Sequence, residues 1–185
     1  LKAPNELNVF GINLNPPLLV LLLSPIAFLS FANAYLLWSA FSLVFIFLAS
    51  RLCLKLIGYR ALESSGLEFF LLFLISYPLL LSIQLGQLTA LYLFLLMVGF
   101  YSYDKGRMIT CALSWALLIS LKLFPALLLI FILKRKQYSL FIKTLGFTLL
   151  FSIIPLIYDP LLYTNYINAL QTITWYSHSW NVSLT

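Results

Sequence analysis

The chain has 185 residues, of which 63% are hydrophobic and 9% are charged, and its net charge is +6. A soluble domain of this length has more polar surface to cover. The composition therefore predicts an all-α integral membrane protein with a single transmembrane domain over residues 1–185 and membrane lipids as partners. It argues against a nucleic-acid partner, because the basic residues flank hydrophobic segments.

The N-terminal half predicts apolar helices of unequal length. The chain starts at Leu1 without a methionine, so we expect a fragment of a longer protein. The predicted helices are Leu18–Ser30, Tyr35–Ile57, Phe69–Ile83 and Leu88–Tyr103. Of these, only Tyr35–Ile57 clearly reaches the roughly 20 apolar residues of a spanning helix. The first of them either crosses the membrane or re-enters it.

The C-terminal half contains two further apolar stretches and one mixed stretch. Met108–Leu133 is interrupted around Lys122 and Pro125, and Tyr138–Ile157 is a further span. Pro160–Trp180 is aromatic and half polar, which is typical of a segment that lies along the membrane interface. We therefore expect residues 159–185 to form an external interfacial segment.

The basic residues predict the orientation of the chain. They form three groups: Arg51, Lys55 and Arg60; Lys105 and Arg107; and Lys134, Arg135, Lys136 and Lys143. By the positive-inside rule all three groups are cytoplasmic. The turns at Gln84–Gln87 and Lys122–Pro125 then point outward. Their arms of about 14–16 residues are roughly 21–24 Å long, less than the hydrocarbon thickness of about 30 Å, so both turns should be recessed.

Lys122 is the only charge within Met108–Leu133. A lysine at the centre of a bilayer-length segment costs on the order of 3 kcal/mol, so it usually marks a functional site. Pro125 should break or kink the helix there. The alternative is one kinked helix across the whole stretch, which would place the groups at Lys105 and Lys134 on opposite sides of the membrane.

Several polar residues should meet on the external side in this topology. The candidate substrate-binding residues are Asn15, Gln87, His178 and Asn181, and Lys122 is the candidate phosphate-binding residue. Amides and aromatic rings suit sugar hydroxyls and ring faces, and one cation suits a phosphate. Each residue also has a structural alternative. Gln87 suits interhelical hydrogen bonding, Lys122 snorkelling to the interface and His178 packing.

The remaining residue types argue against most soluble-enzyme chemistry. Cys53 and Cys111 are isolated in apolar segments and do not make a metal site. Glycine-rich phosphate loops and close pairs of carboxylates are missing from the sequence. Asp159 precedes Pro160 and is a better turn former than catalytic base.

Four stretches carry a resemblance to a known family. They are Asn15-Pro16-Pro17-Leu18 with Ser24-Pro25 and Trp38 downstream, Leu85-Gly86-Gln87-Leu88-Thr89, Leu121-Lys122-Leu123-Phe124-Pro125, and Trp180-Asn181-Val182-Ser183-Leu184. Their order and spacing resemble glycosyltransferase family 87, membrane mannosyltransferases of the GT-C type. The chain departs from the family's pattern at Thr89, where asparagine is commoner, and at Val182, where glutamine is usual.

The resemblance implies a GT-C-like bundle of about 6–8 transmembrane or re-entrant helices in the plasma (bacterial inner) membrane. It further implies transfer of a hexose, usually mannose, from a polyprenyl-phosphate-linked sugar to a lipid-linked or cell-envelope glycan acceptor on the external, periplasmic face. No cofactor or metal is expected, because the leaving group carries its own phosphate. The family's catalytic aspartate precedes the proline-rich helix, whereas Leu1–Leu14 contains only Glu6, so we expect the base upstream of Leu1 and an inactive fragment.

Two other functions fit the same features. A transporter or flippase subunit for a lipid or anionic substrate would also have broken helices and an intramembrane lysine. Internal inverted repeats would favour it, and the sequence shows none. A purely structural subunit would pair Lys122 with an acidic residue of a partner protein.

Overall fold

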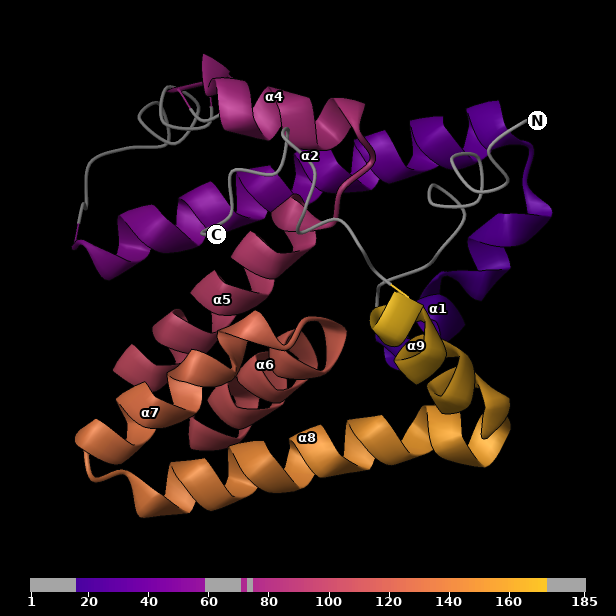
Figure 1. Cartoon of the computed structure of the whole chain (residues 1–185). Helices are drawn as coiled ribbons and strands as arrows, with labels where there is room; N and C mark the ends of the chain where they lie inside the picture. The colour runs from indigo at the N-terminus through magenta and orange to yellow at the C-terminus, as the bar shows by residue number, and fades with distance from the viewer. Residues whose placement is uncertain (1–15, 59–70, 73–74, 173–185) are drawn as a thin grey trace, which may run out of the picture.

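The computed structural model describes residues 16–58, 71–72 and 75–172, and in this part every regular element is helical (Figure 1). The elements are α1 (Pro17–Leu23), η2 (Ser24–Phe28), α2 (Phe31–Leu56), α4 (Tyr77–Gln84), α5 (Thr89–Asp104), α6 (Met108–Leu121), η3 (Phe124–Ala126), α7 (Leu127–Lys134), α8 (Tyr138–Tyr158) and α9 (Leu161–Thr172). The predicted all-α class is confirmed for the described residues.

Four helices pack in the order α2, α5, α6 and α8, and α6 is the central one. Nine of its 14 residues are buried, including Trp115, whose side chain has no exposed surface. Phe100, Tyr103 and Phe131 surround the Trp115 indole with ring centroids 5.2–6.1 Å apart. The core therefore lies around a helix that is too short to cross a bilayer by itself.

Two helices, α2 with 26 residues and α8 with 21, are long and apolar enough to span a membrane by length and composition. Four shorter apolar stretches have 10–17 residues each: Pro17–Phe28, Thr89–Asp104, Met108–Leu121 and Phe124–Lys134. Large apolar side chains lie exposed on the outer helix faces, such as Val44 on α2 and Ile157 on α8. Such faces suit a lipid surrounding. The expected total of 6–8 transmembrane or re-entrant helices stays a prediction.

Prolines set two helix boundaries differently from the sequence prediction. The stretch expected as Leu18–Ser30 divides into α1 and η2, because Ser24 and Pro25 start a 3-10 turn. The helix expected at Phe69–Ile83 is interrupted by extended Ser76, and α4 begins only at Tyr77. Pro78 occupies its first turn, where the missing N–H is no loss. Pro78 therefore starts a helix and does not kink one.

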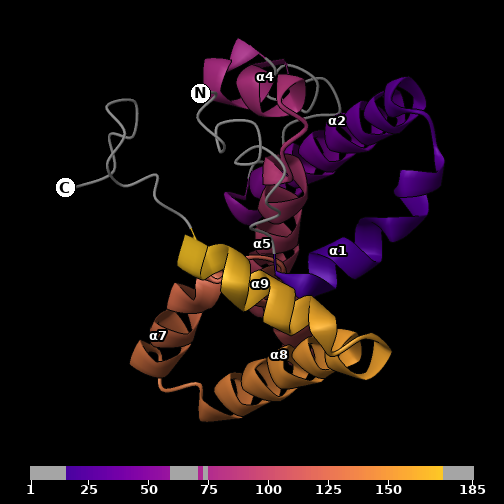
Figure 2. The same ribbon diagram turned by 45° about the vertical axis from the view of Figure 1, so that its right-hand side comes forward.

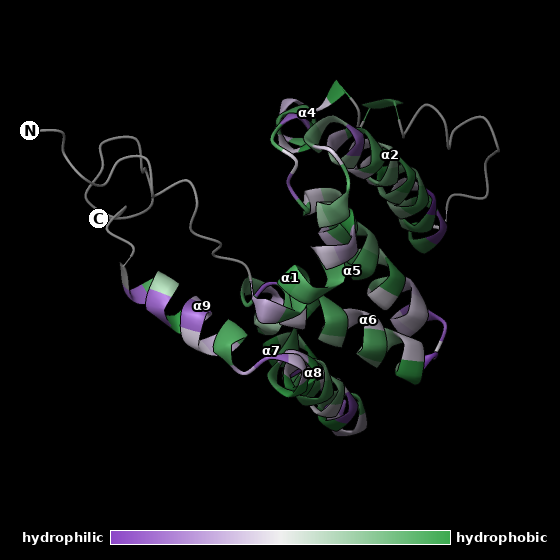
Figure 3. Cartoon of the chain, turned by 90° about the vertical axis from the view of Figure 1, so that its right-hand side faces the viewer, coloured by the Kyte–Doolittle hydropathy of each residue, from purple (hydrophilic) through white to green (hydrophobic). Residues whose placement is uncertain are grey.

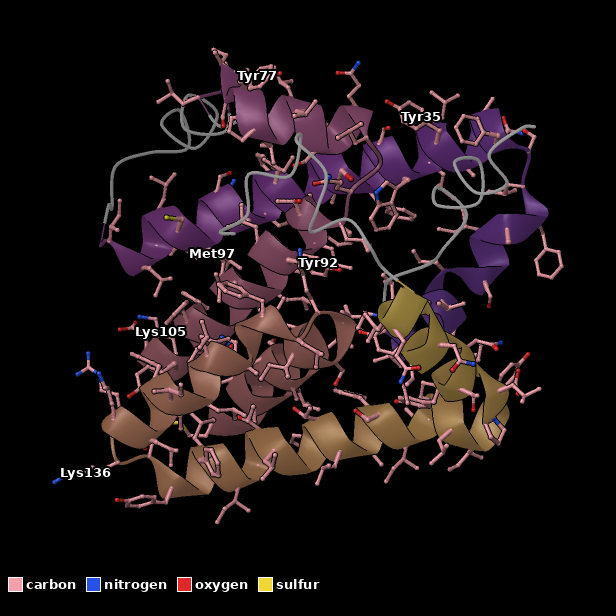
Figure 4. The ribbon with its side chains drawn as sticks, viewed as in Figure 1. Tyr35, Tyr77, Tyr92, Met97, Lys105 and Lys136 are labelled. Atoms are coloured by element: carbon pink, nitrogen blue, oxygen red, sulfur yellow. The ribbon has the colours of Figure 1, made fainter. Side chains whose placement is uncertain are left out.

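The stretch Met108–Leu133 forms two helices, as the paired-helix prediction requires. Phe131, near the end of α7, contacts Tyr103, near the end of α5, with ring centroids 6.1 Å apart. The basic ends of α5 and α7 therefore lie together, and Figure 4 shows Lys105 and Lys136 at the same end of the molecule. The alternative of a single kinked helix is wrong.

Helix α9 differs from the others in polarity and direction. Figure 3 shows hydrophilic positions along α9 where the other helices are mostly hydrophobic, and Figure 2 shows α9 folded back across α1. The Tyr163 hydroxyl donates to the Ser152 carbonyl oxygen at 2.6 Å, which fastens α9 to α8. Asp159 accepts a hydrogen bond from the Leu161 N–H at 2.9 Å, so it forms the turn, as its position before Pro160 predicts.

Candidate functional site

Lys122 lies at the point where α6 ends. Its backbone is extended, with φ −155° and ψ 128°, and its N–H still donates to the Leu118 carbonyl oxygen at 3.1 Å. A cation next to the C-terminus of a helix is favoured by the helix dipole. Pro125 then fits the first turn of η3, where its missing N–H costs nothing. These two residues together explain why the helix breaks here.

The Lys122 side chain is exposed, and its ammonium nitrogen lies 5.4 Å from the centroid of the Tyr92 ring. This is a cation–π contact, worth about 0.5–1 kcal/mol at an exposed position. Tyr92 also donates a hydrogen bond of 3.5 Å to the Leu121 carbonyl oxygen. Among the described residues, no carboxylate lies within ion-pair distance of Lys122. The ammonium is therefore available to an anion.

A second turn joins α4 to α5 around Gly86, whose φ is +64°. The Gln87 N–H donates to the Ser82 carbonyl oxygen at 2.8 Å, which closes the end of α4. Trp38 on α2 donates from its indole N–H to the Gln87 carbonyl oxygen at 3.4 Å. Tyr35, one turn earlier, donates to the Gln84 carbonyl oxygen at 3.5 Å. Two side chains of α2 therefore hold this turn by bonding to the backbone carbonyls of the turn.

The side chain of Gln87 is exposed, and its Oε1 accepts a 3.4 Å hydrogen bond from the Ser82 hydroxyl. This bond joins the turn to α4, the helix that precedes it, and reaches no other helix. Interhelical hydrogen bonding by the Gln87 amide, the structural alternative, is therefore not found among the described residues. The amide is exposed just before α5, and its Nε2–H groups have no partner among the described residues, so they can donate to a ligand.

The two turns border one apolar pocket with a volume of about 460 Å³. Thr89, just after the first turn, lines it together with Phe124 and Pro125 of the second. Tyr92 lines it as well, and the Lys122 ammonium makes its cation–π contact with the Tyr92 ring. We name this cavity the α5–α7 pocket. It places a cation and an apolar surface side by side.

Two other pockets flank the site. One of about 590 Å³ is lined by Tyr35, Trp38 and Gly86 among apolar residues of η2 and α2. The other, of about 110 Å³, is lined half by apolar residues and half by hydroxyl residues of α6, α8 and α9, such as Ser120 and Tyr163. The smaller one is below the roughly 300 Å³ at which ligand pockets begin.

The model of glycosyltransferase family 87 matches residues 13–184. The chain belongs to glycosyltransferase family 87. No curated protein and no solved structure matches it. Membership confirms the resemblance and indicates a glycosyltransferase. Together with the two long apolar helices it also indicates a membrane protein. Neither finding favours the transporter alternative.

The structure of this family 87 chain brings two of the predicted site residues to neighbouring turns. Neither residue lines the α5–α7 pocket itself. The Lys122 ammonium lies over the ring of Tyr92, which lines the pocket, and Gln87 lies two residues before Thr89, which lines it as well. Asn15, His178 and Asn181 lie outside the described residues. Their predicted part in substrate binding stays a prediction.

Sequence reasoning missed Tyr92 in this glycosyltransferase. One signal could have found it. Tyr92 follows Thr89 by three residues, so both share one face of α5 at the end where the turn residues lie. Among the described residues there is no group of three metal-ligating side chains. The expected independence from metal stays untested.

Proposed function

We propose that this glycosyltransferase transfers mannose from a polyprenyl-phosphate donor to a lipid-linked or cell-envelope glycan on the external face of the plasma membrane. Lys122 binds the donor phosphate. One observation supports this most. Lys122 lies at the end of the buried helix α6, next to an apolar pocket, and in the described part of the chain its ammonium has no carboxylate partner. An anionic lipid headgroup is the ligand that such a pairing suits.

In the proposed reaction an acceptor hydroxyl oxygen attacks the anomeric carbon of the donor sugar. The bond between that carbon and the phosphate oxygen breaks, and its electron pair leaves with the polyprenyl phosphate. The hydroxyl proton passes to a general base. Negative charge therefore grows on the phosphate in the transition state, and Lys122 would stabilise it there.

Neither described aspartate suits the role of the base. Asp159 accepts the Leu161 N–H at 2.9 Å and forms a turn. Asp104 pairs with Lys105 at 3.0 Å, at the basic end of α5 and far along the helix from Tyr92. The base is therefore to be sought outside the described residues.

The test is transfer of radiolabelled mannose from polyprenyl-phosphate mannose by the full-length protein in membranes. Lys122→Ala should lower kcat/KM by about 100-fold or more, as loss of one donor to a developing oxyanion does. Lys122→Arg should retain part of the activity, because it keeps the charge. Lys143→Ala is the matched control, since Lys143 is another exposed lysine next to apolar residues, on α8.

Equal turnover of the Lys122→Ala and Lys143→Ala proteins would disprove the phosphate-binding role. Transfer from a nucleotide sugar but not from the lipid-linked donor would disprove the donor class. Normal membrane insertion and thermal unfolding of both variants are required for either comparison.

A further inference from the structure

Two lysines from different helices meet at one aromatic ring, at the basic end of the molecule. The ammonium nitrogen of Lys55, in the last turn of α2, lies 5.9 Å from the centroid of the Tyr101 ring. The ammonium nitrogen of Lys105, which follows α5, lies 5.7 Å from the same centroid. Both lysines are exposed, and Tyr101 is half-buried. The ring therefore brings together two cations that are far apart in the sequence.

A third cation lies one turn before Lys55. Arg51 and Lys55 are four residues apart on α2, so they share one face of the helix, and like charges at this spacing repel each other. Asp104, which pairs with Lys105 at 3.0 Å, is the only carboxylate within ion-pair distance of these three cations in the described part of the chain. An exposed pair of this kind is weak. The cluster therefore keeps a net positive charge, and a bound anion would relieve the repulsion.

The same face of α2 becomes apolar away from the basic end. Four exposed residues lie on it at i, i+4, i+7 and i+11, namely Val44, Leu48, Arg51 and Lys55. The 26 residues of α2 extend about 39 Å, which is about 9 Å more than the hydrocarbon thickness of about 30 Å. The basic end of α2 is the part that suits the headgroup level, and the apolar part of the face then lies in the hydrocarbon. A ligand with an anionic head and apolar tails matches both parts.

We propose that Arg51, Lys55 and Lys105 bind the phosphate of an anionic phospholipid whose acyl chains lie along the apolar part of the same α2 face. Each basic residue at a lipid surface strengthens the binding of anionic headgroups about fivefold, whereas a zwitterionic headgroup has no net charge to attract. The site goes beyond the proposed function, because it takes no part in sugar transfer and lies at the end of α5 opposite to the turn at Gly86.

Native mass spectrometry of the purified full-length protein tests the site, with dioleoyl phosphatidylglycerol and dioleoyl phosphatidylcholine as probes. The wild type should bind phosphatidylglycerol about tenfold or more tightly than phosphatidylcholine. Lys55→Gln combined with Lys105→Gln should weaken the binding of phosphatidylglycerol about tenfold or more, because two basic residues are lost. Lys55→Arg combined with Lys105→Arg keeps both charges and should bind as the wild type does. Equal binding of the two lipids by the wild type would overturn the proposal.

The matched control is Lys134→Gln combined with Lys136→Gln. It also removes two exposed lysines from the basic end, but neither of them contacts Tyr101 (Figure 4). Equal weakening in this control would overturn the proposal, because the lipid would then respond only to the total charge. Lys122→Ala should leave the binding of phosphatidylglycerol unchanged. A failure of the phosphate role of Lys122 is thereby distinguished from a failure of this site.

Two further results would assign the cluster to another anion and overturn the proposal. The first is displacement of phosphatidylglycerol by an equal concentration of glycerol 3-phosphate, which would show that the cluster binds a soluble phosphate and needs no acyl chain. The second is a preference for phosphatidylglycerol that appears only after Glu63→Gln and Glu68→Gln. The chain's own acids would then be the occupant.

Discussion

Tyr92 is the residue that connects the cation to the pocket. Its ring supports the Lys122 ammonium at 5.4 Å, and its hydroxyl bonds to the Leu121 carbonyl oxygen. Tyr92→Phe keeps the ring, so kcat should stay within about twofold of the wild type. Tyr92→Leu removes the cation–π contact of about 0.5–1 kcal/mol and should raise the donor KM severalfold. Steady-state transfer assays with varied donor concentration measure both values, and equal KM values for the two variants would contradict the role of the ring.

Gly99 on α5 is needed because α6 approaches it closely. A Cβ atom at this position would overlap the Trp115 indole. Gly99→Ala should therefore destabilise the protein by about 1–3 kcal/mol through overpacking. Gly146 on α8 is the control, because a Cβ there has open space. Gly146→Ala should stabilise the protein by about 0.5–1 kcal/mol by reducing backbone entropy in the unfolded chain.

Thermal unfolding of the purified protein in detergent measures both changes. Opposite signs for the two glycines are the expected result. A Gly99→Ala protein as stable as the Gly146→Ala protein would show that α5 and α6 can move apart without cost.

At the residue level, a charge was predictable and its surroundings were not. Lys122 stands out in the sequence because it is the only charge in a long apolar stretch, and its insertion is costly. Tyr92 does not stand out, because tyrosine is common in apolar helices and its partner is 30 residues away in the sequence. Only the packing of α5 against α6 brings the two together.

At the level of elements, the turns after α4 and α7 both contain a residue with positive φ, which is glycine in one turn and lysine in the other. Gly86 ends α4 with φ +64°, and Lys136 follows α7 with φ +55°. A left-handed backbone costs a residue with a Cβ about 1–2 kcal/mol. Gly86→Ala should therefore destabilise the protein by about that amount. Lys136→Gly should stabilise the protein by up to about 1 kcal/mol, because glycine adopts a positive φ without strain. The greater backbone entropy of glycine in the unfolded chain reduces this gain.

Thermal unfolding again tests this pair, and Gly86→Asn serves as an intermediate because asparagine tolerates the left-handed region. A Cβ atom at position 86 would have open space, because no atom of the described residues beyond its chain neighbours lies within 4 Å of the place it would occupy. Any loss of stability in Gly86→Ala therefore reports the backbone alone. Stability equal to the wild type would contradict the strain argument.

Helix boundaries were predictable where the composition changes sharply. The predicted Leu88–Tyr103 and Tyr138–Ile157 agree with α5 and α8 within one residue at each end, because polar turns flank both. The predicted Leu18–Ser30 and Phe69–Ile83 do not agree with the structure. There the boundary depends on whether a proline starts a helix or interrupts one, and hydrophobicity does not distinguish these cases.

At the level of the whole molecule, the basic end and the two turns predict opposite sides of the membrane. In a background with Cys53 and Cys111 replaced by alanine, Gln87→Cys should react with a membrane-impermeant maleimide added to intact cells. Lys105→Cys should react only after permeabilisation, because the positive-inside rule predicts its basic group to be cytoplasmic. Its ion pair with Asp104 is exposed, so its loss should not disturb the fold.

The cysteine-free protein is the control for background labelling. The reverse pattern would place the Gln87 turn on the cytoplasmic side and would contradict an external site. The charge pattern alone predicted this arrangement, because each basic group lies at or after the end of an apolar segment. The number of membrane crossings was not predictable, since several helices are shorter than a bilayer and their depth depends on packing.

The contact between Gly99 and Trp115 has a consequence for the site. Gly99 is seven residues from Tyr92, and Trp115 is seven residues from Lys122. Two helical turns rise about 10 Å in each case, and because the two helices are antiparallel, both steps run in the same direction, toward the turns at Gly86 and Lys122. The contact of the Trp115 indole with Gly99 therefore sets the register of α5 against α6. That register in turn sets the distance between the Lys122 ammonium and the Tyr92 ring. A larger side chain at position 99 would displace α5 from α6, so this residue, about 10 Å from the Lys122–Tyr92 contact, sets the geometry of that contact.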